Sequence, residues 1–135
     1  MFSPVKEFAI KNNLMVYQPE TLKNNTDFFN KVKSLNADII CVVAYGKYIP
    51  KEYINICKYE PINVHPSLLP KYRGSSPIQC AVLNGDKETG CTTMYISSKM
   101  DAGDIILQEK VKIGEYETTG ELWTRLSKLR CKTFN

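Results

Sequence analysis

Three polar residues, Asn63, His65 and Asp101, have the types and the spacing that catalysis could use. Asn63 and His65 lie in a short apolar segment that is typical of a β-strand running into a proline-rich loop, so their side chains project from the same face. An amide and an imidazole side by side can hold an oxygen that becomes negative during a reaction. Asp101 precedes another apolar run, where its carboxylate could handle a proton.

The segments around these residues resemble the 10-formyltetrahydrofolate-dependent formyltransferase family. A Ser-Leu-Leu-Pro loop at residues 67–70 follows the Asn-x-His pair directly, and Asp101 opens an Asp-Ala-Gly turn at the distance from His65 that the family shows. These features occur in the family's order, which makes the combination much more specific than the loop alone. The resemblance covers most of the chain, from about residue 3 to residue 129.

Within that family, the chain is most similar to the members that formylate methionyl-tRNA. The similarity lies in Val-Val-Ala-Tyr-Gly-Lys at 42–47, Lys-Tyr-Arg-Gly at 71–74, Pro-Ile-Gln at 77–79 and Gly-Asp-Lys-Glu-Thr-Gly at 85–90. The resemblance implies transfer of a formyl group from 10-formyltetrahydrofolate to the α-amino group of methionyl-initiator-tRNA, a step of translation initiation. His-Pro-Ser at 65–67 is instead similar to the purine-synthesis members. Another amine therefore stays open as the acceptor, either glycinamide ribonucleotide or an amino sugar nucleotide, as does a non-catalytic folate-binding remnant.

The resemblance also implies a role for each candidate residue. Asn63 would donate its side-chain amide to the oxyanion of a tetrahedral intermediate, and His65 would add a second donor. Asp101 would accept the proton of the attacking amine and keep His65 in its useful protonation state. Each residue has a simpler alternative, because Asn63 could only end a strand, His65 could be a hydrogen-bonded structural residue, and Asp-x-Gly is common turn chemistry.

Further binding residues follow from the same resemblance. Arg73 and Gln79 are weaker candidates for contact with the acceptor, since Arg73 could equally be a solvated loop charge. No metal is expected, because the chain has one histidine and its five cysteines form no CxxC pair. The residues implied for the folate co-substrate form three short segments: Gly46, Lys47, Tyr48 and Ile49; Ser67, Leu68, Leu69 and Pro70; and Ser97, Ser98, Lys99 and Met100.

Composition places the chain among ordinary globular proteins. It has 135 residues, enough for one small domain, with 43% hydrophobic and 24% charged residues. The formal net charge of +4 is mild and spread along the chain, so it permits a polyanion such as tRNA without requiring one. Unpaired, reduced cysteines and the lack of a signal peptide or a membrane-length apolar run predict a cytoplasmic protein.

Apolar periodicity and turn residues predict an α/β fold. Helices are expected over residues 5–13, 27–35, 50–58, 77–84 and from 121 onward, and strands over 14–17, 37–44, 61–65, 90–97 and 104–113. Asn25-Thr26 and Thr118-Thr119 are expected to cap the second and the last of these helices. The strand over 37–44 is continuously apolar, which indicates burial on both faces. This order predicts a mostly parallel, Rossmann-like sheet with helices on both faces and a ligand site beyond the carboxyl ends of its strands.

Compared with the family, the chain is expected to be a single partial catalytic domain over residues 1–135. The family's tRNA-modifying members have a first strand and helix before the segment that begins at Ser3, and a barrel-like domain after the catalytic one. Arg130 stands where the family usually has glycine, within an expected helix. We therefore interpret the chain as a fragment or as one piece of a split formyltransferase, whose other pieces would be its partners. An open sheet edge would then be exposed.

Overall fold

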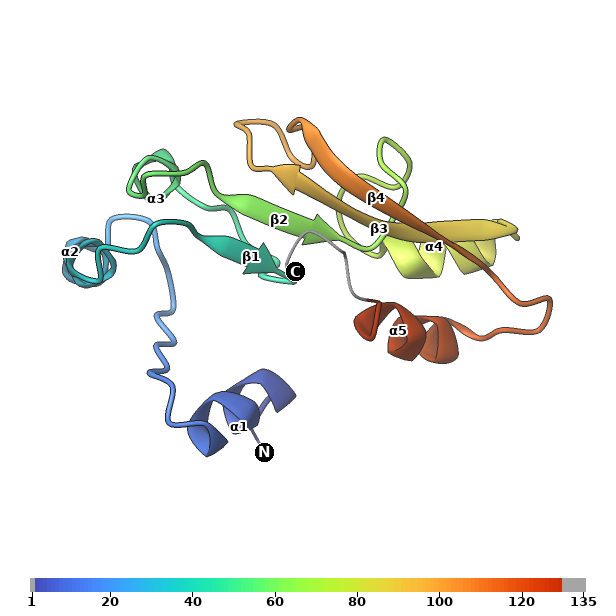
Figure 1. Ribbon diagram of the computed structural model, residues 1–135, viewed down its shortest axis with the longest axis horizontal. Coiled ribbons are helices and arrows are strands. Elements are labelled where there is room, and N and C mark those ends of the chain that lie inside the picture. The colour runs from blue at the N-terminus through green and yellow to red at the C-terminus, as the bar shows by residue number, and fades with distance from the viewer. Residues whose placement is uncertain (1, 130–135) are drawn as a thin grey trace.

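The computed structural model describes residues 2–129 and contains a four-stranded sheet in the order β1-β2-β3-β4 (Figure 1). The strands are β1 (Cys41–Val43), β2 (Ile62–His65), β3 (Glu88–Tyr95) and β4 (Ile105–Lys112). The helices are α1 (Pro4–Lys11), α2 (Thr26–Ser34), α3 (Lys51–Ile54), α4 (Pro77–Leu83) and α5 (Thr119–Ser127). The predicted α/β class is confirmed.

The strand directions differ from the predicted mostly parallel sheet. β1 and β2 are parallel, whereas β2 pairs with β3 and β3 with β4 in antiparallel fashion. Helix α3 carries the chain back to the start of the sheet before β2, which allows parallel pairing. After β2, residues 66–76 and α4 return the chain to the end of the sheet where β2 finished, as the pairing of His65 with Thr92 shows, so β3 must run the other way.

One face of the sheet packs against α4 and α5, which lie together below β3 and β4 in Figure 1. Its core contains Ile78 of α4, Cys91 of β3, and Leu122 and Leu126 of α5. Leu122 and Leu126 are one helical turn apart and therefore face the sheet together. Burying each leucine contributes roughly 1.5–3 kcal/mol. A capping box between Thr118 and Glu121 starts α5 in the register that points both leucines inward.

The opposite face of β3 and β4 is covered by the loop of residues 66–76 rather than by a helix. The Thr92 hydroxyl donates to the carbonyl of Ser67 at 2.7 Å, and Gln108 Nε2 donates to the carbonyl of Leu69 at 2.8 Å. At Gly90 the loop and the neighbouring strand β4 both approach so closely that an added Cβ would collide with the Glu109 carbonyl oxygen of β4 and lie 2.8 Å from Leu68 Cδ2 of the loop. Only glycine fits at this position.

The first sixty residues pack much more loosely than the rest of the chain. Neither α1 nor α2 buries a side chain, and α1 lies away from the sheet at the end of an extended stretch (Figure 1). An aromatic cluster joins α2 to α3, with ring centroids 5.3 Å apart between Phe29 and Tyr53 and 6.0 Å apart between Tyr17 and Phe28.

Three predictions in this region were wrong in extent. The strand expected over 37–44 is only Cys41–Val43, and Val43 is 65% exposed, because β1 has a neighbouring strand on one side only. Residues 14–17 are extended but form no strand, since no other strand pairs with them. The helix expected over 50–58 ends at Ile54.

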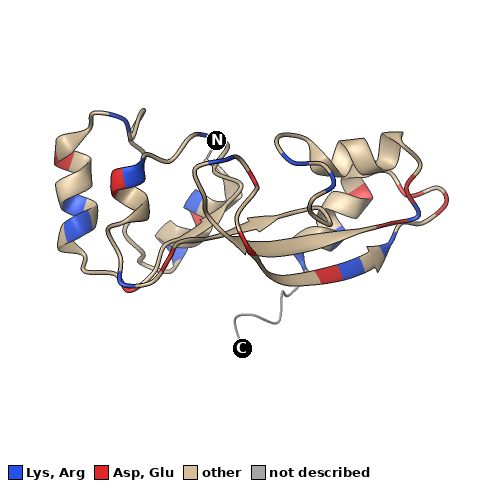
Figure 2. Ribbon diagram, turned by 90° about the horizontal axis from the view of Figure 1, so that it is seen from above, with Lys and Arg blue, Asp and Glu red and all other residues tan. Residues whose placement is uncertain are grey.

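The other predicted elements are confirmed to within a few residues, including the Asn25 cap of α2 and the Thr118 cap of α5. Arg130 and Cys131 lie outside the described residues. None of the helices within residues 2–129 is long and apolar enough to cross a membrane. Basic and acidic side chains are interspersed over most elements (Figure 2).

Candidate active site

His65 and Asp101 face each other on the sheet face that the 66–76 loop covers. His65 ends β2, and the loop between β3 and β4 folds back so that Asp101 Oδ2 lies 3.6 Å from His65 Nδ1. Their side chains are only 7% and 13% exposed. At this distance the carboxylate can balance a positive charge on the imidazole, but it is too far away for a strong hydrogen bond to Nδ1. The structure therefore brings together two of the three residues that the sequence singled out for catalysis.

Both nitrogens of the His65 ring face protein groups. Nε2 lies 2.8 Å from the carbonyl oxygen of Tyr72, while Nδ1 faces Asp101. A carbonyl oxygen only accepts hydrogen bonds, so Nε2 is the donor in this contact. Nδ1 is therefore the nitrogen that can exchange a proton with other groups.

Asp101 is held from two directions by the loop that follows β2. The backbone N–H of Gly74 donates to Asp101 Oδ2 at 2.8 Å, and Arg73 Nε donates to the Asp101 carbonyl oxygen at 2.9 Å. Asp101 itself has a φ of 48°, in the left-handed region that aspartate tolerates better than most residues. Arg73, the candidate for acceptor phosphate, thus contacts the backbone of the candidate catalytic carboxylate.

Asn63 lies two residues before His65 on the same face of β2, as strand alternation requires. Its side chain is half-buried, opposite Met94 of β3. Within residues 2–129, no hydrogen-bond partner engages the Asn63 amide. That amide is free to donate to an incoming oxygen, next to the His65–Asp101 pair.

The segment Ser67 to Pro70, predicted to contact folate, is largely engaged within the protein. The Ser67 side chain is fully buried and its hydroxyl donates to the Lys71 carbonyl at 2.7 Å. The backbone N–H of Leu69 donates to Thr92 Oγ1 at 3.2 Å, and Leu68 packs against Gly90. Pro70 is the exposed member of the segment.

The other two predicted folate segments are exposed loops. Because β1 and β2 are parallel and Val43 pairs with Val64, residues 44–49 leave the sheet at the end where His65 lies. Tyr48 is 69% exposed, and Lys47 Nζ donates to the Glu20 carbonyl at 2.9 Å. On the Asp101 side, Ser97, Ser98 and Lys99 are exposed, and the Met100 sulfur lies near Gly74.

Gln79 does not reach the candidate site in this structure. It belongs to α4, which packs through Ile78 and Val82 on the sheet face that carries Val64, and His65 points to the other face. Gln79 Oε1 is buried without a hydrogen-bond partner among the described residues.

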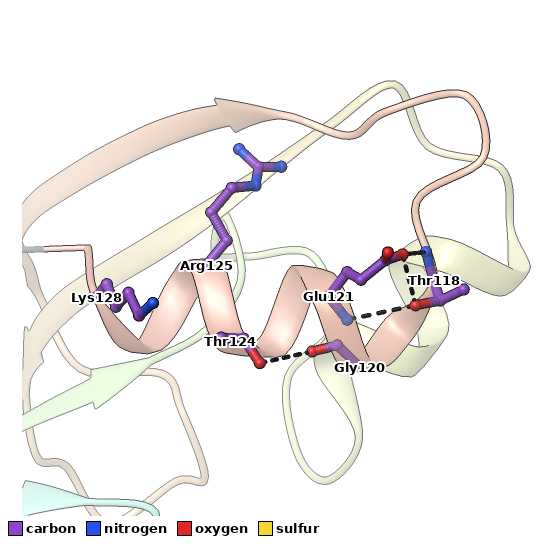
Figure 3. A pocket seen from close by; sticks show the side chains of 6 residues that line it. All are labelled: Thr118, Gly120, Glu121, Thr124, Arg125 and Lys128. Carbon is purple, nitrogen blue, oxygen red and sulfur yellow. Dashed lines mark hydrogen bonds between the residues drawn. The ribbon is translucent and has the colours of Figure 1, made fainter.

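A groove of about 590 Å³ lies elsewhere, along the outer side of α5 (Figure 3). Hydrogen bonds from the Arg125 side chain and the Gly114 backbone lower the pKa of Glu117 beside it, and bonds from Thr118 lower the pKa of Glu121. None of the predicted site residues lines this groove, and the side chains of Thr118, Glu121, Thr124 and Arg125 already bond to one another or to backbone. It is lined by Thr118, Gly120, Glu121, Thr124, Arg125 and Lys128.

Sequence reasoning missed the residues that support the His65–Asp101 pair. Tyr72 and Gly74 lie in the Lys-Tyr-Arg-Gly segment that carried part of the family resemblance, but only Arg73 was singled out from it. Thr92 and Gln108, which anchor the covering loop, had no sequence signal, because their partners lie far along the chain. Within residues 2–129, no group of His, Cys, Asp and Glu side chains is arranged to hold a metal ion.

Residues 1–134 match a protein family described as formyl transferase. Among curated proteins, the chain is 50% identical over 125 residues to a methionyl-tRNA formyltransferase of Fusobacterium nucleatum, covering 93% of this chain and 40% of the relative. It is 49% identical over 131 residues to a methionyl-tRNA formyltransferase of Clostridioides difficile, covering 97% of this chain and 42% of the relative. The chain thus spans about 40% of the length of these relatives.

Solved structures resemble the fold. A phosphoribosylglycinamide formyltransferase from Bacillus halodurans matches with a TM-score of 0.80 at 27% identity, covering 91% of this chain and 66% of that one. A formyltetrahydrofolate deformylase from Pseudomonas syringae matches with a TM-score of 0.74 at 25% identity, covering 90% of this chain and 42% of that one.

Proposed function

Since the chain belongs to the formyl transferase family, we propose that it forms the catalytic part of an enzyme that transfers a formyl group from 10-formyltetrahydrofolate to the α-amino group of methionyl-tRNA. The methionyl-tRNA acceptor is supported by the relatives of that name, which are about 50% identical over nearly the whole of this chain. The single observation that carries the catalytic assignment is the shielded His65–Asp101 pair beside the free amide of Asn63.

Asn63, His65 and Asp101 each have a role in the proposed reaction. The amine attacks the formyl carbon, the formyl oxygen becomes an oxyanion, the amine loses a proton, and the bond between carbon and N10 of the folate breaks as N10 gains a proton. Asn63 donates to the oxyanion, which in other enzymes contributes about 3 kcal/mol to the lowering of the barrier. His65 exchanges a proton with the reacting groups through Nδ1, since Nε2 is bonded to the Tyr72 carbonyl. Asp101 balances the charge on the ring and takes up the proton.

The co-substrate is proposed to lie over the exposed loops beside this pair. Residues 46–49 leave the sheet next to the end of β2, and Met100 lies beside Gly74 on the Asp101 side. Tyr48 and Met100 are 69% and 76% exposed, so both offer apolar surface to a flat ring. Pro70 is the member of its segment that remains accessible.

A second acceptor, glycinamide ribonucleotide, is favoured by the structural comparison alone. The solved structures that resemble the fold include phosphoribosylglycinamide formyltransferases, at 22–29% identity among the first five of them. The much higher identity to the tRNA-named relatives makes methionyl-tRNA the preferred acceptor. The two acceptors can be compared directly by offering each to the same preparation.

The decisive experiment measures formyl-methionine formed from 10-formyltetrahydrofolate and methionyl-tRNA by the chain and by its Asn63→Ala variant. Loss of one oxyanion donor is expected to lower kcat by about 10²–10³-fold. Asn30→Ala, at an exposed position of α2, is the matched control and should retain activity. Equal turnover of Asn63→Ala and the control would remove the oxyanion role, and turnover with glycinamide ribonucleotide only would replace the acceptor.

A further inference from the structure

We propose that Tyr72 is a positioning residue, which fixes the proton of the neutral His65 ring on Nε2 and so makes Nδ1 the nitrogen that exchanges a proton with the reacting groups. The nature of those groups rests on the proposed function. The fixing of the ring does not, because it depends only on contacts within residues 65–101.

The contact that fixes the ring is the Tyr72 carbonyl, 2.8 Å from His65 Nε2. In a neutral imidazole only one nitrogen carries hydrogen, and a carbonyl accepts only from that one. A proton on Nδ1 alone would leave two lone pairs facing each other at Tyr72. His65 is 6% exposed, which leaves little room for water as a substitute donor. Asp101 faces Nδ1 from 3.6 Å, too far to repay the lost contact with a strong hydrogen bond, so the alternative tautomer is disfavoured.

Tyr72 holds its carbonyl there in a backbone conformation that bulky residues rarely adopt. Its φ is 56°, in the left-handed region. Such strain persists only where surrounding contacts impose it, and it concentrates at functional sites. The imposing contacts are at the phenol, which donates to Asp86 Oδ2 at 2.9 Å and accepts from Asn84 Nδ2 at 3.0 Å. Both partners follow α4, which is packed into the core.

The same short segment also sets the position of Asp101. Gly74 N–H and Arg73 Nε hold the carboxylate and the carbonyl of that residue. One anchored loop therefore determines both sides of the 3.6 Å gap between Nδ1 and Oδ2. That gap is longer than a strong hydrogen bond, so a polar group of the substrate can meet both atoms.

The chain offers an unusually clean test, because His65 is its only histidine. In a sample labelled with ¹⁵N in histidine, long-range proton–nitrogen spectra show a single ring and report which nitrogen carries hydrogen in the neutral form. We expect a protonated Nε2 and an unprotonated Nδ1 in the wild-type chain. Tyr72→Phe, which removes only the anchoring hydroxyl, should shift the ring toward a mixture of tautomers.

Two further variants separate positioning from general destabilisation. Asp86→Asn keeps an acceptor for the phenol and should retain the wild-type tautomer, whereas Asp86→Ala should behave like Tyr72→Phe. Tyr116→Phe removes a hydroxyl at a residue that is 90% exposed and should change nothing. Thermal unfolding of each variant verifies that the compared samples are folded. A wild-type ring protonated on Nδ1 alone, or a Tyr72→Phe spectrum identical to wild type, would overturn the proposal.

The activity measurement completes the test. Tyr72→Phe is expected to lower kcat of formyl transfer by about ten- to a hundredfold, the scale of a misplaced catalytic group, with KM close to wild type. If no acceptor is formylated while the tautomer data are as expected, the proposed function fails and the positioning role stands. If formylation proceeds with the tautomer unbiased, the positioning role fails and the proposed function stands.

Discussion

The two halves of the chain differ in how far they bury their apolar side chains. The buried hydrophobic side chains of the second half are Ile62, Leu69, Ile78, Ala81, Cys91, Met94, Leu122 and Leu126. Between residues 2 and 60, Tyr53 alone belongs to this buried set. In the first half Val5, Phe8 and Met15 are 79%, 65% and 70% exposed. The candidate catalytic residues all lie in the half that packs well, where rigid neighbours can hold a reactive geometry.

The sheet edges show the same contrast. β4 carries Lys110 and Lys112 at its edge, which discourage pairing with another strand. β1 is Cys-Val-Val, without a charge, and its Val43 is largely exposed. Exposed apolar surface on this scale is typical of surfaces that pack against another polypeptide segment. The half that holds the candidate catalytic residues is thus organised by its own core, while the first half exposes its apolar faces.

The largest effect should come from the core of the second half. Leu122→Ala removes a fully buried side chain between α5 and the sheet and is expected to lower the free energy of unfolding by about 2–5 kcal/mol. Phe8→Ala in α1 should change it by less than about 0.5 kcal/mol, because that side chain is exposed. Urea unfolding of both variants measures the contrast. Equal losses would show that the two halves are equally packed.

A smaller effect is expected where the 66–76 loop meets the sheet. Gly90→Ala places a methyl group against the Glu109 carbonyl and Leu68, so the free energy of unfolding should fall by about 1–3 kcal/mol. Gly120→Ala in α5 meets no atom within 4 Å and should stabilise the chain by about 0.5–1 kcal/mol. Melting temperatures that move in the same direction for both alanines would contradict the close approach at Gly90.

The smallest effect concerns pH and the Glu117–Arg125 contact, whose atoms Oε2 and Nη2 are 2.8 Å apart. The hydrogen bond from Arg125 lowers the pKa of Glu117 in the folded chain. The contact therefore stabilises the fold at pH values above the pKa that Glu117 has in the unfolded chain. This stabilisation is lost as the pH falls through the pKa of Glu117 in the folded chain. Glu117→Gln should therefore cost about 0.5–1 kcal/mol at neutral pH and nothing at strongly acidic pH. A cost that stays constant as the pH falls would exclude this linkage.

Sequence reasoning went furthest where local signals decide the structure. The caps at Asn25 and Thr118 and the strand ending at His65 are local features, and each lies where it was predicted. The extent of β1 was missed because an apolar run reads the same whether its strand has one neighbour or two. Strand direction after β2 was missed because it depends on how residues 66–76 cross the sheet.

The candidate site divides in the same way. Asn63, His65 and Asp101 could be selected from residue type and spacing, and the structure places His65 beside Asp101. The contacts of Tyr72 with His65 and of Arg73 with Asp101 could not, since they join a left-handed loop to residues up to 28 positions away. The burial of Ser67 likewise depends on Lys71 and Thr92, which no local pattern connects to it.

The catalytic assignment is tested most directly by formyl transfer in the Asp101→Asn variant, which keeps the size of the side chain and removes its ability to take a proton. We expect kcat to fall by about 10²–10⁴-fold, the usual contribution of general acid–base catalysis. Asp104→Asn, an exposed change in the same loop, should leave the rate unaltered. Matching rates for the two variants, with both folded, would contradict a role for Asp101 in proton transfer.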